Sequence, residues 1–123
     1  MGKPGEIIPR RGEVYFVNFD SSIGSEIQKT RPAVVLQNDI GNRYSRATIV
    51  AALTSDKGER LYPTEVRIHR GEAGLTVDSV VLLSQIHTID KTRVHKKFGC
   101  LRPETMQQVD TALLVSLGLI NDI

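Results

Sequence analysis

The stretch "GSEIQKTRPAVVLQND", residues 24–39, joins a polar segment to an apolar run rich in β-branched residues. Proline has no backbone N–H to donate, so Pro32 fits the first residue of a strand over 32–38. Arg31 stands directly before that strand, at the end of a polar loop over 20–30. Two interpretations of Arg31 follow: an ordinary surface charge, or a fixed cation that holds an anion.

Similar β-type runs recur along the rest of the chain. The expected strands cover residues 13–19, 32–38, 47–54, 64–68, 79–89 and 96–101, with polar loops between them and a helical turn within 39–46. Short strands, long polar loops and the lack of alternating strand and helix predict a mainly β (α+β) fold. We expect a small, strongly bent sheet or half-open barrel.

The last segment changes to a helical period. Pro103 suits the first turn of a helix, and Glu104 favours the positive end of its dipole. Apolar residues then recur at three- or four-residue steps, at Met106, Val109, Leu113, Leu117 and Ile120. The sequence therefore predicts a C-terminal amphipathic helix after the sheet.

Length and composition indicate one globular domain. The chain has 123 residues, of which 40% are hydrophobic and 24% charged. Residues 1–9 contain two glycines and two prolines and are expected to form a flexible tail, with a single domain over 10–123. The single cysteine cannot form an internal disulfide, and no apolar stretch approaches the ~20 residues of a membrane span. We therefore expect a cytoplasmic protein without a membrane partner.

The net charge of +2 does not by itself indicate a nucleic-acid partner. Cations nevertheless cluster in "KTR", "NRYSR" and "RVHKKFG", the last two beside Tyr44 and Phe98. A fold that gathers these clusters on one face has a phosphate-tracking groove with aromatic stacking partners. A solvated, mixed surface is the alternative.

Motifs of common enzymes are missing from the sequence. The three histidines lie apart, without metal-ligand spacing, and there is no GxSxG motif or phosphate-binding glycine loop. We expect no metal site and no cofactor. Arg31 and Thr54 remain; their separation of 23 residues equals a strand, a loop and a second strand, which would bring the two strand ends together. A guanidinium and a hydroxyl are donors suited to a phosphodiester transition state.

Several blocks resemble the MazF/PemK family of toxin endoribonucleases: "RRGEVYFVNFD", "GSEIQKTRPAVVLQNDIGNRYS", "TIVAALTS", "YPTEV", "LLSQIHTID" and "VDTALLVSLGLI". They run in order from about Arg10 to Ile120 and are most similar to members from Gram-positive bacteria. The resemblance implies an SH3-like or CcdB-like barrel with a C-terminal helix, acting as a homodimer. It also implies sequence-specific, metal-independent cleavage of single-stranded RNA and a cognate antitoxin that covers the RNA groove.

The resemblance assigns roles to particular residues. The family's catalytic arginine and threonine match Arg31 of "TRP" and Thr54 of "ALTS". Glu26 is the candidate acid/base or substrate-orienting group, with a plain loop charge as the alternative. Ser25 and Gln85 match positions that help shape the RNA groove. Tyr62 and Pro63, in the loop after Thr54, are candidates to flank a base, with a packing role as the alternative. Relatives commonly carry an acidic residue before the glutamine, where this chain has Ser84, so a cleavage sequence cannot be transferred from them.

A second interpretation belongs to a different class of protein. CcdB-like toxins share the implied fold and inhibit DNA gyrase without enzymatic activity. Gyrase inhibition does not require the Arg31 and Thr54 pair, so RNA cleavage without metal separates the two interpretations. A catalytically inactive RNA-binding regulator is a third interpretation, which the intact pair disfavours.

Overall fold

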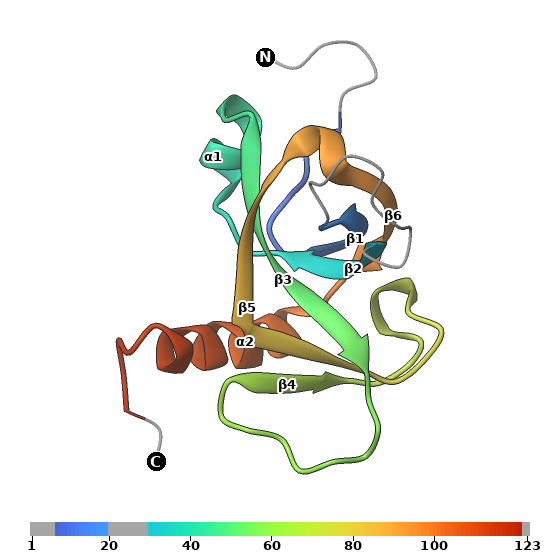
Figure 1. The fold of residues 1–123 in the computed structure, drawn as a ribbon, viewed down its shortest axis with the longest axis vertical. Helices are drawn as coiled ribbons and strands as arrows, with labels where there is room; N and C mark the ends of the chain where they lie inside the picture. Colours follow the sequence, from blue (N-terminus) through green and yellow to red (C-terminus); the bar gives the residue numbers. More distant parts are fainter. Residues whose placement is uncertain (1–6, 20–29, 122–123) are drawn as a thin grey trace.

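Figure 1 shows the computed structural model, which describes residues 7–19 and 30–121. Six antiparallel strands form one sheet in the order β4-β5-β3-β2-β1-β6. The strands are β1 (Glu13–Asn18), β2 (Thr30–Val35), β3 (Ala47–Ser55), β4 (Glu65–Ile68), β5 (Ser79–Asp90) and β6 (Val94–Cys100). The helical elements are α1 (Asp39–Tyr44), η2 (Glu72–Gly74), η3 (Lys91–Arg93) and α2 (Pro103–Ser116). The expected fold class, mainly β with a C-terminal helix, is confirmed.

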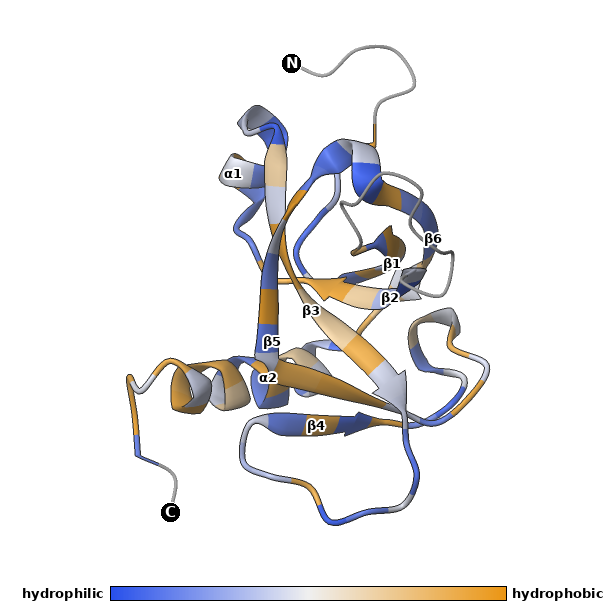
Figure 2. Ribbon diagram, viewed as in Figure 1, coloured by the Kyte–Doolittle hydropathy of each residue, from blue (hydrophilic) through white to orange (hydrophobic). Residues whose placement is uncertain are grey.

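The sheet curls, so that its central strands are buried on both faces. Along β2, Val34 joins a core beneath α2, whereas Ala33 and Val35 join a second core within the other half of the sheet. Successive strand side chains point to opposite faces, which explains why this strand reads as a continuous apolar run. Figure 2 shows the apolar residues along β2 and β5.

Pro32 is the third residue of β2, not the first as the sequence predicted. It pairs with Phe16 of β1, but pairing of β2 with β3 begins only at Ala33. The strand is therefore unpaired on its β3 side at Pro32, where proline's missing donor removes no ladder bond. This short one-sided segment carries Arg31.

Helix α2 packs against β4 and β5 through Val109 and Ala112, both fully or nearly fully buried. It ends earlier than the periodicity predicted. Gly118 has a φ of 74°, and the amide N–H groups of Gly118 and Leu119 donate to carbonyl oxygens of the last turn. This is the Schellman arrangement that closes a helix. Leu117, which is 58% exposed, therefore lies at the end of the helix and not on its buried face.

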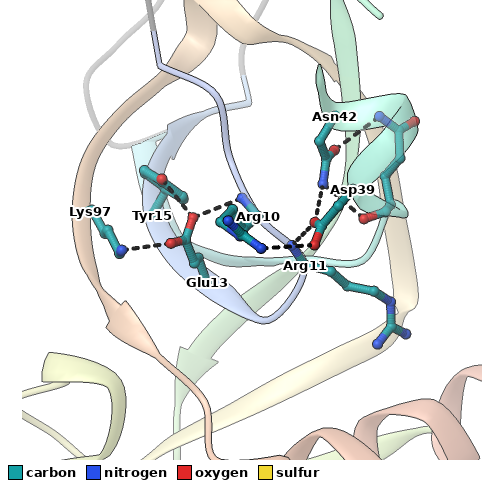
Figure 3. Close-up of polar contacts among 8 residues, drawn as sticks. Arg10, Arg11, Glu13, Tyr15, Asp39, Asn42 and Lys97 are labelled. Atoms are coloured by element: carbon teal, nitrogen blue, oxygen red, sulfur yellow. Dashed lines mark hydrogen bonds and ion pairs between the residues drawn. The ribbon is translucent and has the colours of Figure 1, made fainter. Parts of the chain in front are cut away.

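Polar contacts hold the N-terminal corner to the rest of the chain (Figure 3). The Arg11 side chain donates to the carbonyl oxygen of Leu36 over 2.9 Å and forms an ion pair with Asp110 of α2. Buried Glu13 accepts hydrogen bonds from the Arg10 amide and the Tyr15 hydroxyl, both at 2.8 Å. These contacts join β1, the segment after β2 and the C-terminal helix.

The described part of the predicted N-terminal tail is residues 7–9, where Ile7 packs against the second core and Pro9 is buried. Residues 1–6 lie outside the described range. In the described chain, no helix is both long and apolar enough to cross a membrane.

Candidate active site

The sheet topology brings Arg31 and Thr54 to one place. Strands β2 and β3 are antiparallel neighbours, with Ala33 opposite Ala52 and Val35 opposite Val50. Continuing that register by two residues places Arg31 opposite Thr54. Directly opposite residues in a sheet carry their side chains on the same face. The proximity predicted from their spacing in the sequence thus follows from the strand order.

Both residues line one cavity of about 300 Å³. Its lining comes from β2, the end of β3, the start of β5, the loop before β5, and β6. The lining residues are Arg31, Pro32, Leu53, Thr54, Ser55, Leu75, Thr76, Val77, Ser79 and Phe98. A cation and several hydroxyls therefore share a cavity whose other walls are apolar, an arrangement typical of a small-ligand site.

The electrostatics of this cavity favour an anion. Within the described residues, no carboxylate lies within ion-pair distance of the Arg31 guanidinium, whereas Arg11, Arg67 and Arg102 each pair with one. A buried or half-buried arginine without an acidic partner attracts an anionic ligand, and its planar fork matches two oxygens of a phosphate.

The carboxylate nearest in sequence to Thr54 is already engaged. Asp56 forms an ion pair with Arg67 and accepts a hydrogen bond from the Gly58 amide over 2.8 Å. The hydrogen bond from Arg67 holds the pKa of Asp56 below its ordinary value, with the Gly58 amide adding to the effect. Arg67 also donates to the carbonyl oxygen of Glu59 over 3.1 Å. The loop after β3 is thereby tied to β4, and the Asp56 charge is neutralised.

A second cavity, of about 200 Å³, adjoins the first and shares Thr54 and Ser55 with it. Tyr62 lines this cavity and is 72% exposed, so its ring is available to a ligand. Lys57 and Arg60 also line it and add positive charge. Thr54 therefore lies between two cavities.

The other predicted RNA-binding residues lie elsewhere or outside the described range. Pro63 lines a wide groove between β4 and α2. Gln85 is exposed on β5 beyond the bulge that separates Ile86 from Val81, and it lines neither of the two cavities at Thr54 in the described chain. Ser25 and Glu26 lie outside the described residues. The roles assigned to these four positions stay predictions.

Sequence reasoning missed most of the cavity wall. In the sequence, Thr76 and Val77 belong to a turn-rich segment that predicts no site. Ser79 lines the cavity because it pairs with Ser55 across the sheet. For Phe98 the sequence indicates only an aromatic residue next to a cluster of cations. Long-range strand pairing is the missing information, since no local pattern in the sequence states which strands are neighbours.

Metal ligands do not cluster in the described ranges, 7–19 and 30–121: no three histidine, cysteine, aspartate or glutamate side chains lie close enough together to hold an ion. His87 instead contacts the Phe19 ring, with ring centroids 4.8 Å apart. The metal-free chemistry implied by the resemblance stays a prediction for experiment.

A curled antiparallel sheet and a C-terminal helix define a small β protein that places an arginine and a threonine at one cavity. The model of the family described as PemK-like, MazF-like toxin of type II toxin-antitoxin system matches residues 10–117. Endoribonuclease EndoA of Bacillus subtilis (strain 168) is 47% identical over 115 residues, which make up 94% of this chain and 99% of the relative. The chain therefore belongs to the PemK-like, MazF-like toxin family.

Solved structures share the fold. An endoribonuclease from mycobacterial species has a TM-score of 0.77 and 24% identity, covering 96% of this chain and 99% of its own. A mycobacterial endoribonuclease in complex with its cognate antitoxin has a TM-score of 0.76 and 25% identity, covering 93% and 99%. The fold predicted from the sequence is thus shared with these solved endoribonucleases.

Proposed function

We propose that this chain is a toxin endoribonuclease that cleaves single-stranded RNA at a specific sequence, without a metal ion. The observation that carries the proposal is the shared cavity of Arg31 and Thr54 in a chain 47% identical to an endoribonuclease. RNA supplies its own nucleophile, the 2′-hydroxyl. The protein therefore needs no activated serine or cysteine, and the sequence shows no motif for one.

The reaction needs charge stabilisation, alignment and two proton transfers. The 2′-oxygen forms a bond to the neighbouring phosphorus and loses its proton to a base, while the bond from phosphorus to the 5′-oxygen breaks and that oxygen takes up a proton. The products are a 2′,3′-cyclic phosphate, or the 3′-phosphate after hydrolysis, and a 5′-hydroxyl. Arg31 and Thr54 donate hydrogen bonds to the phosphoryl oxygens as negative charge develops on them.

The proton acceptor is a separate assignment. Arginine has a pKa above ~12 and is a poor base, so Arg31 serves charge stabilisation and, as a second role, proton donation to the leaving oxygen. Glu26 is the candidate base or orienting group because of its place in the "GSE" block. Ser25, Gln85, Tyr62 and Pro63 are the candidate contacts to the RNA strand, where exposed bases are read by stacking and by hydrogen bonds to their edges.

Two protein partners belong to this proposal. A cognate antitoxin of acidic, partly disordered sequence would cover the RNA groove and fold on binding, as the antitoxin complex among the structural relatives supports. A second copy of the chain would form a two-fold dimer. Exposed apolar residues at the end of α2 supply surface for such a contact: Leu114, Leu117, Leu119 and Ile120. The proposed location is the cytoplasm.

The test is cleavage of a long single-stranded RNA in EDTA by the purified protein, with the ends of the products sequenced. We expect cuts at one short sequence, with 5′-hydroxyl ends. Arg31→Ala is expected to lower the rate by a factor of about 10²–10³, the effect of one lost transition-state donor. Arg70→Ala is the control, since Arg70 is exposed and lines neither cavity at Thr54. An uncut RNA together with inhibited DNA gyrase would instead favour the CcdB-like interpretation.

A further inference from the structure

The cavity at Arg31 and Thr54 is larger and more apolar than a phosphate requires. Its apolar lining includes Phe98 of β6 with Leu75 and Val77 of the loop before β5. A phosphate is bound by hydrogen-bond donors and positive charge, and apolar side chains do not stabilise it. A volume of about 300 Å³ lies at the lower end of the range for small-ligand sites and is enough for one nucleobase beside the phosphate.

An aromatic pair extends this wall. The rings of Phe16 and Phe98 meet edge to face, with centroids 5.9 Å apart and planes at 85°. Phe16 lies opposite Pro32 across the β1–β2 pair and is 37% exposed. Proteins that bind single-stranded nucleic acids place aromatic rings next to phosphate-binding cations, because every base has a face on which to stack.

Close backbone packing holds the wall in place. A Cβ atom added to Gly74 would lie 2.1 Å from the Phe98 carbonyl oxygen, and one added to Gly99 would lie 2.6 Å from the Ala73 carbonyl carbon. Only glycine allows this approach of η2 to β6. Figure 1 shows the loop between β4 and β5, which contains η2, as the yellow segment.

An ion pair at η2 adds a second attachment to the same loop. Glu72 accepts hydrogen bonds from the Arg102 amide at 3.0 Å and from the Arg102 guanidinium at 3.2 Å. The loop is thereby tied to β6 and to the start of α2. The cavity is consequently formed before a ligand arrives, and binding does not have to order its wall.

Hydroxyl groups give the cavity a means to distinguish bases. Ser55 and Thr76 are exposed at its edge, and each can both donate and accept a hydrogen bond. Ser79 donates to the Val77 carbonyl oxygen over 3.0 Å, which leaves its oxygen as an acceptor. Polar groups at fixed positions around an apolar slot are the usual basis of selectivity between similar ligands.

We propose that this cavity is a nucleobase subsite: it takes the base of a nucleotide adjoining the scissile phosphate, which stacks on Phe98 and is enclosed by Val77. The inference rests on the proposed function and adds to it the place where one base is selected. An apolar side chain of the antitoxin is the competing occupant. Arg31, which has no acidic partner among the described residues, and the hydroxyls beside the aromatic wall favour a nucleotide, which alone uses all three.

The experiment combines two variants with modified RNA. Val77→Trp fills the cavity, and since Val77 is 53% exposed the change should leave the fold intact. Phe98→Leu keeps apolar volume but removes the stacking face. Ile40→Trp is the matched control for added bulk, since Ile40 is a 75% exposed apolar residue on α1 that lines neither cavity at Thr54. The substrates are the cleaved RNA sequence and a set in which one nucleotide at a time lacks its base but keeps its 2′-hydroxyl.

We expect Val77→Trp and Phe98→Leu each to lower cleavage of the intact RNA about 5- to 100-fold, the range for one lost base stack. For one of the base-free RNAs, cleavage by the wild-type protein should be slower by the same factor. Neither variant should slow cleavage of that RNA further. Unchanged cleavage by Val77→Trp would overturn the subsite, as would additive losses for every base-free RNA. Weakened antitoxin binding with normal cleavage would assign the cavity to the antitoxin. Failure of the proposed function is distinct, because the wild-type protein would then leave the intact RNA uncut.

Discussion

Replacing Thr54 by valine is the cleanest test of how this site works. Valine has the shape of threonine and keeps its β-branch, so strand β3 retains its backbone preference. Thr54 is half-buried, and no hydrogen bond from its hydroxyl is formed within the described residues. The change therefore removes a hydroxyl from the cavity and little else.

The expected magnitudes follow from these surroundings. A donor that meets charge only in the transition state contributes ~3–4 kcal/mol, so kcat should fall by about 10²–10³. Among the described residues, folding loses no hydrogen bond at Thr54. The free energy of unfolding should accordingly change by less than about 0.5 kcal/mol, as for other substitutions away from the core.

Thr48, on the same strand, supplies the opposite control. It is fully buried, and its hydroxyl donates to the Asn42 side-chain oxygen over 2.6 Å. That oxygen also accepts from Gln37 at 3.0 Å, so Thr48→Val leaves it with one partner. We expect a loss of about 1–1.5 kcal/mol and a melting temperature lower by about 3–8 °C, with normal activity.

The assay measures single-turnover cleavage of one RNA oligonucleotide at saturating enzyme and the thermal unfolding of each variant. Thr54→Val should lose activity without losing stability, and Thr48→Val should lose stability without losing activity. Equal cleavage rates for wild type and Thr54→Val would refute the proposed role of Thr54, because the hydroxyl would then contribute nothing to the transition state. A Thr54→Val protein that melts as low as Thr48→Val would also count against it.

Further predictions concern the metal, pH and the two ends of the molecule. Excess EDTA should leave cleavage unchanged; loss of activity that Mg²⁺ restores would contradict the metal-free mechanism. Burial alone would raise the pKa of Glu13, but hydrogen bonds from Lys97, the Arg10 amide and Tyr15 lower it below 4.5. Its contribution to stability is therefore present above pH 4.5 and is lost as the pH falls through the lowered value, so acid unfolding monitored by circular dichroism should be less steep in Glu13→Gln. Gly118→Val should lower stability by about 1 kcal/mol in chemical denaturation, because the positive φ suits glycine. Leu117→Glu should shift sedimentation toward the monomer if the end of α2 lies in the dimer contact.

The strands could be predicted because their signal is local. Alternating or continuous β-branched runs placed the ends of all six strands to within three residues. The closest agreement includes β3, expected over 47–54 and found at Ala47–Ser55. The end of α2 could not be placed from apolar periodicity alone. Leu117 and Ile120 continue the period, but Gly118 closes the helix between them, and backbone hydrogen bonding outweighs side-chain pattern at that point.

The site could be predicted only in part, for a related reason. Arg31 and Thr54 stand at the ends of strands that are consecutive in the sheet as well as nearly so in the sequence, so their spacing was informative. Phe98 and Val77 reach the cavity through β6 and the loop before β5, and their positions depend on strand order and on the Gly74 and Gly99 packing. Nothing local in the sequence encodes either.

In the first block that carries the family resemblance, the charged side chains hold the fold together. In "RRGEV", Arg11 binds Asp110 and the Leu36 carbonyl oxygen, and Glu13 binds Tyr15 and Lys97. These charged residues are engaged in joining β1 to α2 and β6, although a cluster of arginines next to a glutamate reads equally well as an RNA contact. Arg31 belongs to the second block, "GSEIQKTRPAVVLQNDIGNRYS", and has no acidic partner in the described chain. Its charge is therefore available to a ligand. Whether a charge is satisfied within the fold, rather than whether it belongs to a family motif, therefore decides which of these residues can act on a substrate.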